Sequence, residues 1–174
     1  MLKLFALSSS AVVLAVLISG CVVWYSTFDY APASRYLRQA EQAARQGKTK
    51  EAETYYLRHI QFRLDFKERP DWENPYFYHL LIGDLYLKEN NIEEALSHYQ
   101  KARSEGVELG LVADRFRQIA SFYESEEKFD QAISFLSEHR ELDPLLFDLM
   151  RDRIAREMVQ IEERSKDPET PRPQ

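Results

Sequence analysis

The chain has 174 residues, of which only five are glycine and one is cysteine, and its formal net charge at pH 7 is −6. This length suits one domain with short appendages, and a composition rich in Ala, Leu, Glu, Arg and Gln favours an all-α domain. An acidic chain without a basic stripe argues against a nucleic-acid partner and against charge-driven binding to anionic lipid. A single cysteine excludes an intrachain disulfide.

Residues 1–20 have the pattern of a secretory signal peptide. Lys3 supplies a positive start, an apolar stretch follows over residues 4–17, and the small residues Ser19 and Gly20 precede Cys21. The run Ile18–Cys21 resembles the lipobox of bacterial lipoproteins, in which the cysteine is lipidated and becomes the mature N-terminus. The resemblance implies fatty acylation of Cys21, a tether over residues 21–32, and a domain in the cell envelope. Because Val22 follows the cysteine, enteric-type sorting would direct it to the outer membrane, facing the periplasm.

The same N-terminus also allows an uncleaved membrane span. Residues 4–28 carry no charge, and about 20 apolar residues suffice to cross a bilayer. The chain stays apolar over residues 22–25, where a lipoprotein usually has a polar tether. The alternative is therefore a bitopic inner-membrane protein, and in both interpretations the domain lies outside the cytoplasm.

The remaining sequence reads as helical hairpins over residues 33–64, 76–107 and 113–144. Small and aromatic residues recur in each at fixed offsets, which lets two antiparallel helices approach closely. In the central hairpin these residues are Ile82, Gly83, Tyr86, Ala95, Tyr99 and Ala102; the first has Ala40, Gly47, Ala52 and Tyr56, and the third has Phe116, Ile119, Ala120, Tyr123, Ala132 and Leu136. This spacing resembles the tetratricopeptide (TPR) repeat. The expected fold is an all-α, short TPR-like solenoid of about three hairpins over residues 33–166.

Two further segments flank and interrupt the hairpins. The proline-bounded segment 69–75 is an insertion between the first two hairpins, and we expect Trp72 within it to pack as a lid, the other interpretation being an exposed binding residue. Pro144 opens a last helix to about Ser165, whose apolar stripe suits a capping helix: Leu146, Met150, Ile154, Met158 and Ile161. A dimer helix is the rival interpretation, so a monomer is favoured only slightly. The proline-rich residues 167–174 are expected to be disordered.

No motif for catalysis, nucleotide binding or metal binding is present, so we expect neither an enzyme nor a cofactor. The four histidines lie far apart in sequence, and His59 and His139 fall at normally small, packed repeat positions. We interpret both as near-core residues rather than metal ligands.

The TPR resemblance implies a concave groove lined by the first helix of each hairpin. The residues it assigns to a partner-binding groove are Leu37, Arg45, Phe77, Leu80, Asp84, Leu87, Lys88, Arg117 and Ser121. Phe77, Leu80 and Leu87 would hold an apolar peptide or helix, and Asp84, Lys88 and Arg117 would orient it. Alternatively, the loop 69–75 or the segment before Ala33 covers these residues. The expected function is a membrane-anchored scaffold or adaptor that binds a protein or peptide; the alternative is a periplasmic chaperone or subunit domain of a bitopic inner-membrane protein.

Overall fold

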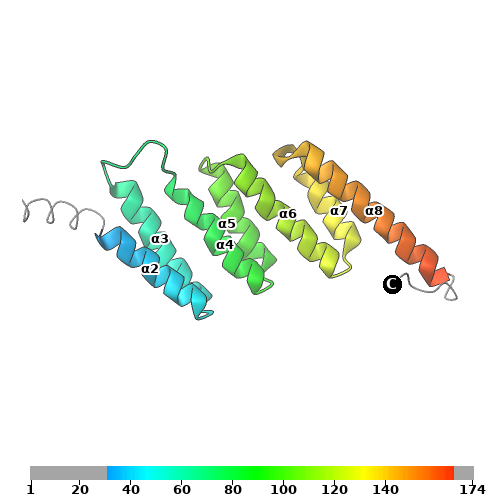
Figure 1. Ribbon diagram of the computed structural model, residues 1–174, viewed down its shortest axis with the longest axis horizontal. Helices are drawn as coiled ribbons and strands as arrows, with labels where there is room; N and C mark the ends of the chain where they lie inside the picture. Colours follow the sequence, from blue (N-terminus) through cyan, green and yellow to red (C-terminus); the bar gives the residue numbers. More distant parts are fainter. Residues whose placement is uncertain (1–30, 167–174) are drawn as a thin grey trace, which may run out of the picture.

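A computed structural model describes residues 31–166 and contains seven α-helices in that range (Figure 1). They are α2 (Ala31–Arg45), α3 (Thr49–Asp65), α4 (Tyr78–Lys88), α5 (Ile92–Ser104), α6 (Leu109–Ser125), α7 (Phe129–Glu138) and α8 (Pro144–Lys166), with short 3₁₀ turns η1 (Pro75–Phe77) and η2 (Arg140–Leu142). The prediction of an all-α fold is confirmed. The predicted signal peptide, Cys21, most of the tether and the tail 167–174 lie outside the described residues. Within residues 31–166, no helix is long and apolar enough to cross a membrane.

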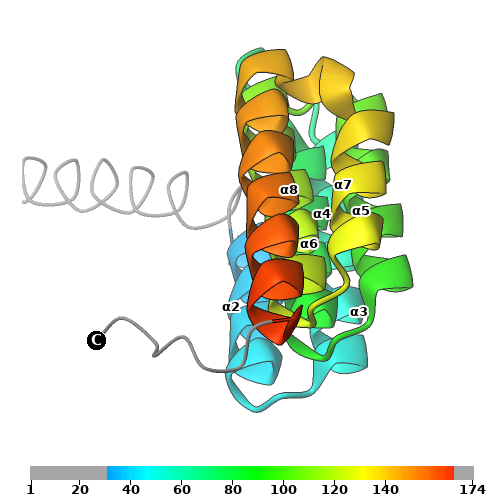
Figure 2. The ribbon, with the colours of Figure 1, turned by 90° about the vertical axis from the view of Figure 1, so that its right-hand side faces the viewer.

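The helices pack as sequential antiparallel pairs. Helix α2 pairs with α3, α4 with α5 and α6 with α7, while α8 closes the array against α7. Viewed along the array, α4, α6 and α8 lie in one layer and α3, α5 and α7 in the other (Figure 2). The turns within hairpins lie along one long edge of the array, and the connections between hairpins lie along the opposite edge (Figure 1).

The three turns within hairpins share one backbone geometry. Each has three residues, and the middle one adopts positive φ: Gly47 at 71°, Asn90 at 59° and Glu127 at 57°. The following N–H donates to the carbonyl five residues earlier in every case, at 3.0, 2.9 and 2.8 Å for residues 48, 91 and 128. This is the bond that satisfies an orphaned carbonyl at a helix C-terminus. The repetition of one turn at three places indicates that the hairpins are structurally equivalent.

Glu127 lacks the glycine that its backbone conformation favours. Positive φ places a Cβ against the following carbonyl, which glycine avoids. We therefore expect Glu127→Gly to raise the free energy of unfolding by about 0.5–1 kcal/mol. Gly47→Ala should lower it by a similar amount, although no atom lies within 4 Å of the added Cβ. Urea denaturation of both variants tests the pair, and a change of the same sign in both would contradict it.

Small buried residues bring the helices together at the predicted register. Ala52, Ala95 and Ala132 occupy equivalent positions in the three second helices, and all are fully buried. Ala40, Gly83 and Ala120 do the same in the first helices. Large side chains fill the space beside them, above all Tyr99 and Phe116, both fully buried. The predicted core positions of the hairpins are thus confirmed.

Helix α8 is confirmed as the last helix of residues 31–166, but its buried side is shorter than predicted. Phe147, Met150 and Ile154 are buried, whereas Ile161 is 43% exposed. Helix α7 has only ten residues against the 23 of α8, so the C-terminal part of α8 extends beyond its neighbour (Figure 1).

Candidate functional site

The predicted groove residues all lie on η1 or on the first helices α2, α4 and α6, but Leu80 does not reach the surface. Helix α4 contacts α3, α5 and α6, and Leu80 is fully buried among them. The prediction for Leu80 is corrected: it belongs to the core. Leu81 and Leu85 were not among the predicted groove residues; like Phe77 and Leu87, they are partly exposed and pack against the core cluster. They recur with Phe77 and Lys88 at helical spacing, and we call Phe77, Leu81, Leu85 and Lys88 the α4 stripe.

Leu87, also predicted to lie in the groove, is partly exposed and packs against the core cluster. The helical periodicity turns it about 100° away from Lys88, so its side chain lies beside the α4 stripe rather than within it. The prediction that Leu87 holds a partner remains a prediction.

The α4 stripe opens at its N-terminal end into a hollow of about 630 Å³. The loop between α3 and η1, the start of α4 and the connection from α5 to α6 surround it. Apolar side chains supply most of the lining: Trp72, Phe77, Tyr78, Val107 and Leu111. Trp72 is 85% exposed, so the prediction that it packs as a lid is wrong. The surface at this end of α4 is apolar and open.

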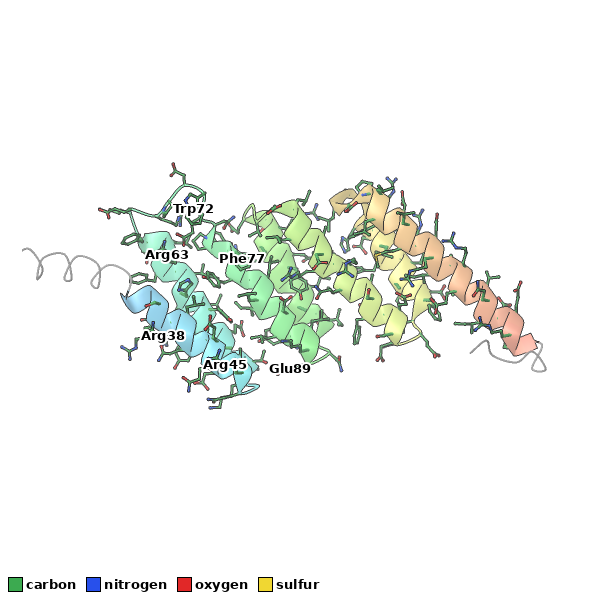
Figure 3. The ribbon with its side chains drawn as sticks, in the orientation of Figure 1. Arg38, Arg45, Arg63, Trp72, Phe77 and Glu89 are labelled. Atoms are coloured by element: carbon green, nitrogen blue, oxygen red, sulfur yellow. The ribbon has the colours of Figure 1, made fainter. Side chains whose placement is uncertain are left out.

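Trp72 is exposed although the residues around it are firmly held. Arg63 on α3 is 5% exposed and forms a bidentate ion pair with Glu73, in which Nε donates to Oε1 at 2.6 Å. Next along the chain, the Asn74 side-chain amide donates to the Glu105 carbonyl at 2.9 Å. The indole is thus carried on a fixed loop, and Figure 3 shows it beside Arg63 and above Phe77.

Asp84 joins three helices instead of standing free in a groove. It accepts a hydrogen bond from the Tyr99 hydroxyl at 2.9 Å and one from Arg115 Nη2 at 3.1 Å. Burial and the neighbouring Asp84 carboxylate raise the pKa of the Tyr99 hydroxyl, which therefore stays a donor. These bonds fix α4 against α5 and α6, and the prediction that Asp84 orients a partner remains a prediction.

The face of α6 beside the α4 stripe is polar. Arg117 donates to Asp114 Oδ1 from Nη2 at 2.6 Å, and Gln118 donates to the same carboxylate at 2.9 Å. Ser121, one turn further along, is partly exposed. Arg117 and Ser121 remain accessible, but the charge of Arg117 is already paired.

The exposed face of α2 carries cations. Leu37 is partly exposed and Arg45 is exposed. Arg38 and Arg45 on α2, like Lys88 on α4, form no ion pair among residues 34–165. Figure 3 shows Arg38 and Arg45 along α2, with Arg38 on the side of α2 away from α4. Of the predicted groove residues, Arg45 on α2 and Lys88 at the end of α4 are thus exposed cations without an ion pair among residues 34–165.

The fold brings two histidines together that lie 19 residues apart in sequence. His79 Nδ1 and His98 Nδ1 are 2.9 Å apart, so one ring donates and the other accepts. Burial, and then the His98 charge, lower the pKa of His79 to about 4. Burial also lowers the pKa of His98, although Glu53, 3.5 Å from His98 Nε2, opposes it. The pair is a neutral packing contact between α4 and α5.

The other two histidines lie in the core, as predicted. His59 is 4% exposed against the edge of Tyr78, and His139 is 9% exposed against Phe116 and Phe135. Among the residues that the structure describes, no three His, Cys, Asp or Glu side chains are grouped as metal ligands would be.

The neutral histidine pair predicts acid sensitivity. The unfolded chain takes up protons near pH 6.5 while folded His79 does so only near pH 4, so the unfolded state binds more protons in between. We expect the free energy of unfolding to fall by roughly 2–3 kcal/mol from pH 6.5 to pH 4. His79→Gln should flatten this fall, as measured by urea denaturation across the range. An unchanged acid slope in the variant would contradict the assignment.

Comparisons with models of protein families, with curated proteins and with solved structures found no match.

Proposed function

We propose that this chain is a TPR-type adaptor, anchored in a bacterial envelope membrane, that binds a segment of a partner protein along α4. The observation that carries the proposal is the α4 stripe. The stripe lies on the middle hairpin of three, where a partner would have flanking helices on both sides. Leucine and phenylalanine side chains left partly open at helical spacing are the form in which proteins receive an amphipathic helix or an extended apolar peptide.

The charges around the stripe favour a partner segment with acidic residues beside its apolar ones. Arg45 and Lys88, both predicted groove residues, are exposed cations without an ion pair among the described side chains. Complementary charge sets the orientation and the rate of association more than the affinity. We therefore assign Phe77, Leu81 and Leu85 to apolar contact, and Arg45 and Lys88 to orientation.

The anchor in this proposal is Cys21, acylated after removal of residues 1–20. The mass of the N-terminal peptide isolated from membranes tests it, with Cys21→Ala as control. A peptide that begins at acylated Cys21 supports the lipoprotein. An intact Met1 with an unmodified thiol would favour the alternative, a bitopic inner-membrane protein whose periplasmic domain serves as a chaperone or complex subunit.

Site-specific photo-crosslinking in cells tests the binding surface. A photoreactive amino acid placed at Leu81, Lys88 or Arg45 should give a discrete adduct with the same partner. Gln100 on α5 and Ser134 on α7 are exposed positions outside the first-helix surface and serve as matched controls. Adducts that arise equally at both sets of positions, or only at the controls, would overturn the assignment of the α4 stripe.

A further inference from the structure

The two long edges of the array differ in polarity. We call the edge with the turns inside hairpins the tip edge, and the edge with the connections between hairpins the corner edge (Figure 1). The tip edge consists of residues 46–48, 89–91 and 126–128, which are all exposed and contain no apolar side chain. The corner edge consists of the residues between α3 and η1, between α5 and α6, and between α7 and α8, with the helix starts that follow them.

Each connection on the corner edge exposes one large apolar side chain. Trp72 is 85% exposed between α3 and η1, Leu109 is 49% exposed at the first position of α6, and Leu145 is 73% exposed at the second position of α8. Leu149, one turn further along α8, is 58% exposed. Among the residues that the structure describes, three other large apolar side chains are exposed away from this edge: Leu57, Val159 and Ile161. Single exposed leucines are ordinary. Here, however, each of the three connections on the corner edge has an exposed large apolar side chain, and none of the three turns on the tip edge has one.

The chain also enters the domain at the corner edge. Helix α2 begins beside the end of α3, where the Trp72 loop starts (Figure 1). Nine residues separate Cys21 from Ala31, so these two residues lie at most about 33–36 Å apart. Six of the nine have aliphatic or aromatic side chains: Val22, Val23, Trp24, Tyr25, Phe28 and Tyr30. An anchor at Cys21 therefore holds the corner edge close to the bilayer, whether the nine residues are extended or not.

We propose that the corner edge rests on the lipid bilayer, with Trp72 in the interfacial region and the long axis of the array parallel to the membrane. Tryptophan settles at the level of the lipid headgroups, where its ring is half in apolar surroundings and its N–H can reach a polar partner. The proposal rests on the membrane anchorage of the N-terminus described above.

Apolar contact, not charge, fixes this orientation. The corner edge carries Asp71, Glu73 and Glu108 beside Lys67 and Arg69, so anionic lipid has no cationic patch to attract. The covalent anchor keeps the domain at the membrane, and the apolar corners decide which edge faces it. Because the Arg63–Glu73 pair and the Asn74–Glu105 bond hold the loop, Trp72 reaches the interface without an ordering cost.

Tryptophan fluorescence of the full-length protein in vesicles of phosphatidylethanolamine and phosphatidylglycerol tests this. The chain has two tryptophans, so Trp24→Phe leaves Trp72 as the sole reporter. Lipids brominated near the headgroup should quench its emission about twofold or more, and the emission should be blue-shifted. The quenching should persist at high salt, since apolar contact is not screened. The triple variant Trp24→Phe, Trp72→Phe, Gln46→Trp moves the reporter to the tip edge, where the brominated lipids should leave it unquenched.

The outcomes separate the orientation from the anchorage. Flotation with the vesicles together with quenching of Trp72 alone supports the proposal. Flotation with an unquenched Trp72 that acrylamide reaches freely overturns the orientation and leaves the anchorage intact. Shielding from acrylamide without quenching by brominated lipid also overturns it, since protein then covers the ring. Failure to float removes the anchorage and the orientation with it. Circular dichroism confirms that each variant is folded before it is scored.

Discussion

Gly83→Ala should lower the free energy of unfolding by roughly 2–3 kcal/mol. A Cβ at this position would lie 2.3 Å from Tyr99 Cε1, 2.7 Å from Tyr99 Cδ1 and 3.0 Å from the Ala95 carbonyl oxygen. The ring cannot move aside, because Tyr99 is fully buried and its hydroxyl donates to Asp84. Alanine raises helix propensity by about 1 kcal/mol relative to glycine, but this gain is smaller than the cost of the clash.

Gly110→Ala is the matched control, since Gly110 is also helical but its added Cβ would meet only Glu108 Oε1, at 3.9 Å. This variant should be neutral or stabilised by about 0.5 kcal/mol, so the two substitutions differ in sign. Urea denaturation measures both. Combining Gly83→Ala with Tyr99→Leu should cost less than the sum of the single variants, because the second change removes the ring that clashes. Strict additivity would show that the close approach at Gly83 is not the cause.

Local patterns determine the features of this fold that the sequence predicted. The small residues Ala52, Ala95 and Ala132, with the glycine or asparagine of two hairpin turns, fix where each helix pair closes. These signals are short in range and depend on residue size or backbone conformation alone. The turn at Glu127 has the same geometry without either residue type. The prediction of this turn therefore depended on the helical periodicity of the segments on both sides of it.

The rotation of α4 about its own axis depends on all of its neighbours, so local sequence patterns do not determine it. Helix α4 is apolar nearly all round, and periodicity alone cannot tell which leucine faces the core. Contacts with α3, α5 and α6 decide this: they bury Leu80 fully and leave Leu81 and Leu85 partly exposed. The meeting of His79 with His98 likewise depends on the contact between α4 and α5. The exposure of Trp72 depends on the ion pair at Glu73, whose partner Arg63 lies ten residues earlier.

That ion pair is the second place where a single substitution should have a large effect. Glu73→Ala should lower the free energy of unfolding by about 3 kcal/mol, because it leaves the buried Arg63 guanidinium without its carboxylate. The pair Lys48–Glu51 has both side chains about half exposed, so Glu51→Gln should change stability by less than about 0.5 kcal/mol. Replacing both partners, Arg63→Met with Glu73→Leu, should recover much of the loss, since no buried charge remains. A double variant as unstable as Glu73→Ala would contradict this account.

The pH dependence of the Arg63–Glu73 pair separates it from the histidine pair. Hydrogen bonding from Arg63 lowers the pKa of Glu73 below its usual 4.5. The stability it supplies is therefore complete above pH 4.5 and is lost as the pH falls through the lower, folded-state value. The histidine contribution is lost at higher pH, between 6.5 and 4. Glu73→Gln should thus flatten only the most acidic part of the profile. It should also loosen the loop that carries Trp72, so lipid quenching of the indole should fall at neutral pH while the helix content stays unchanged.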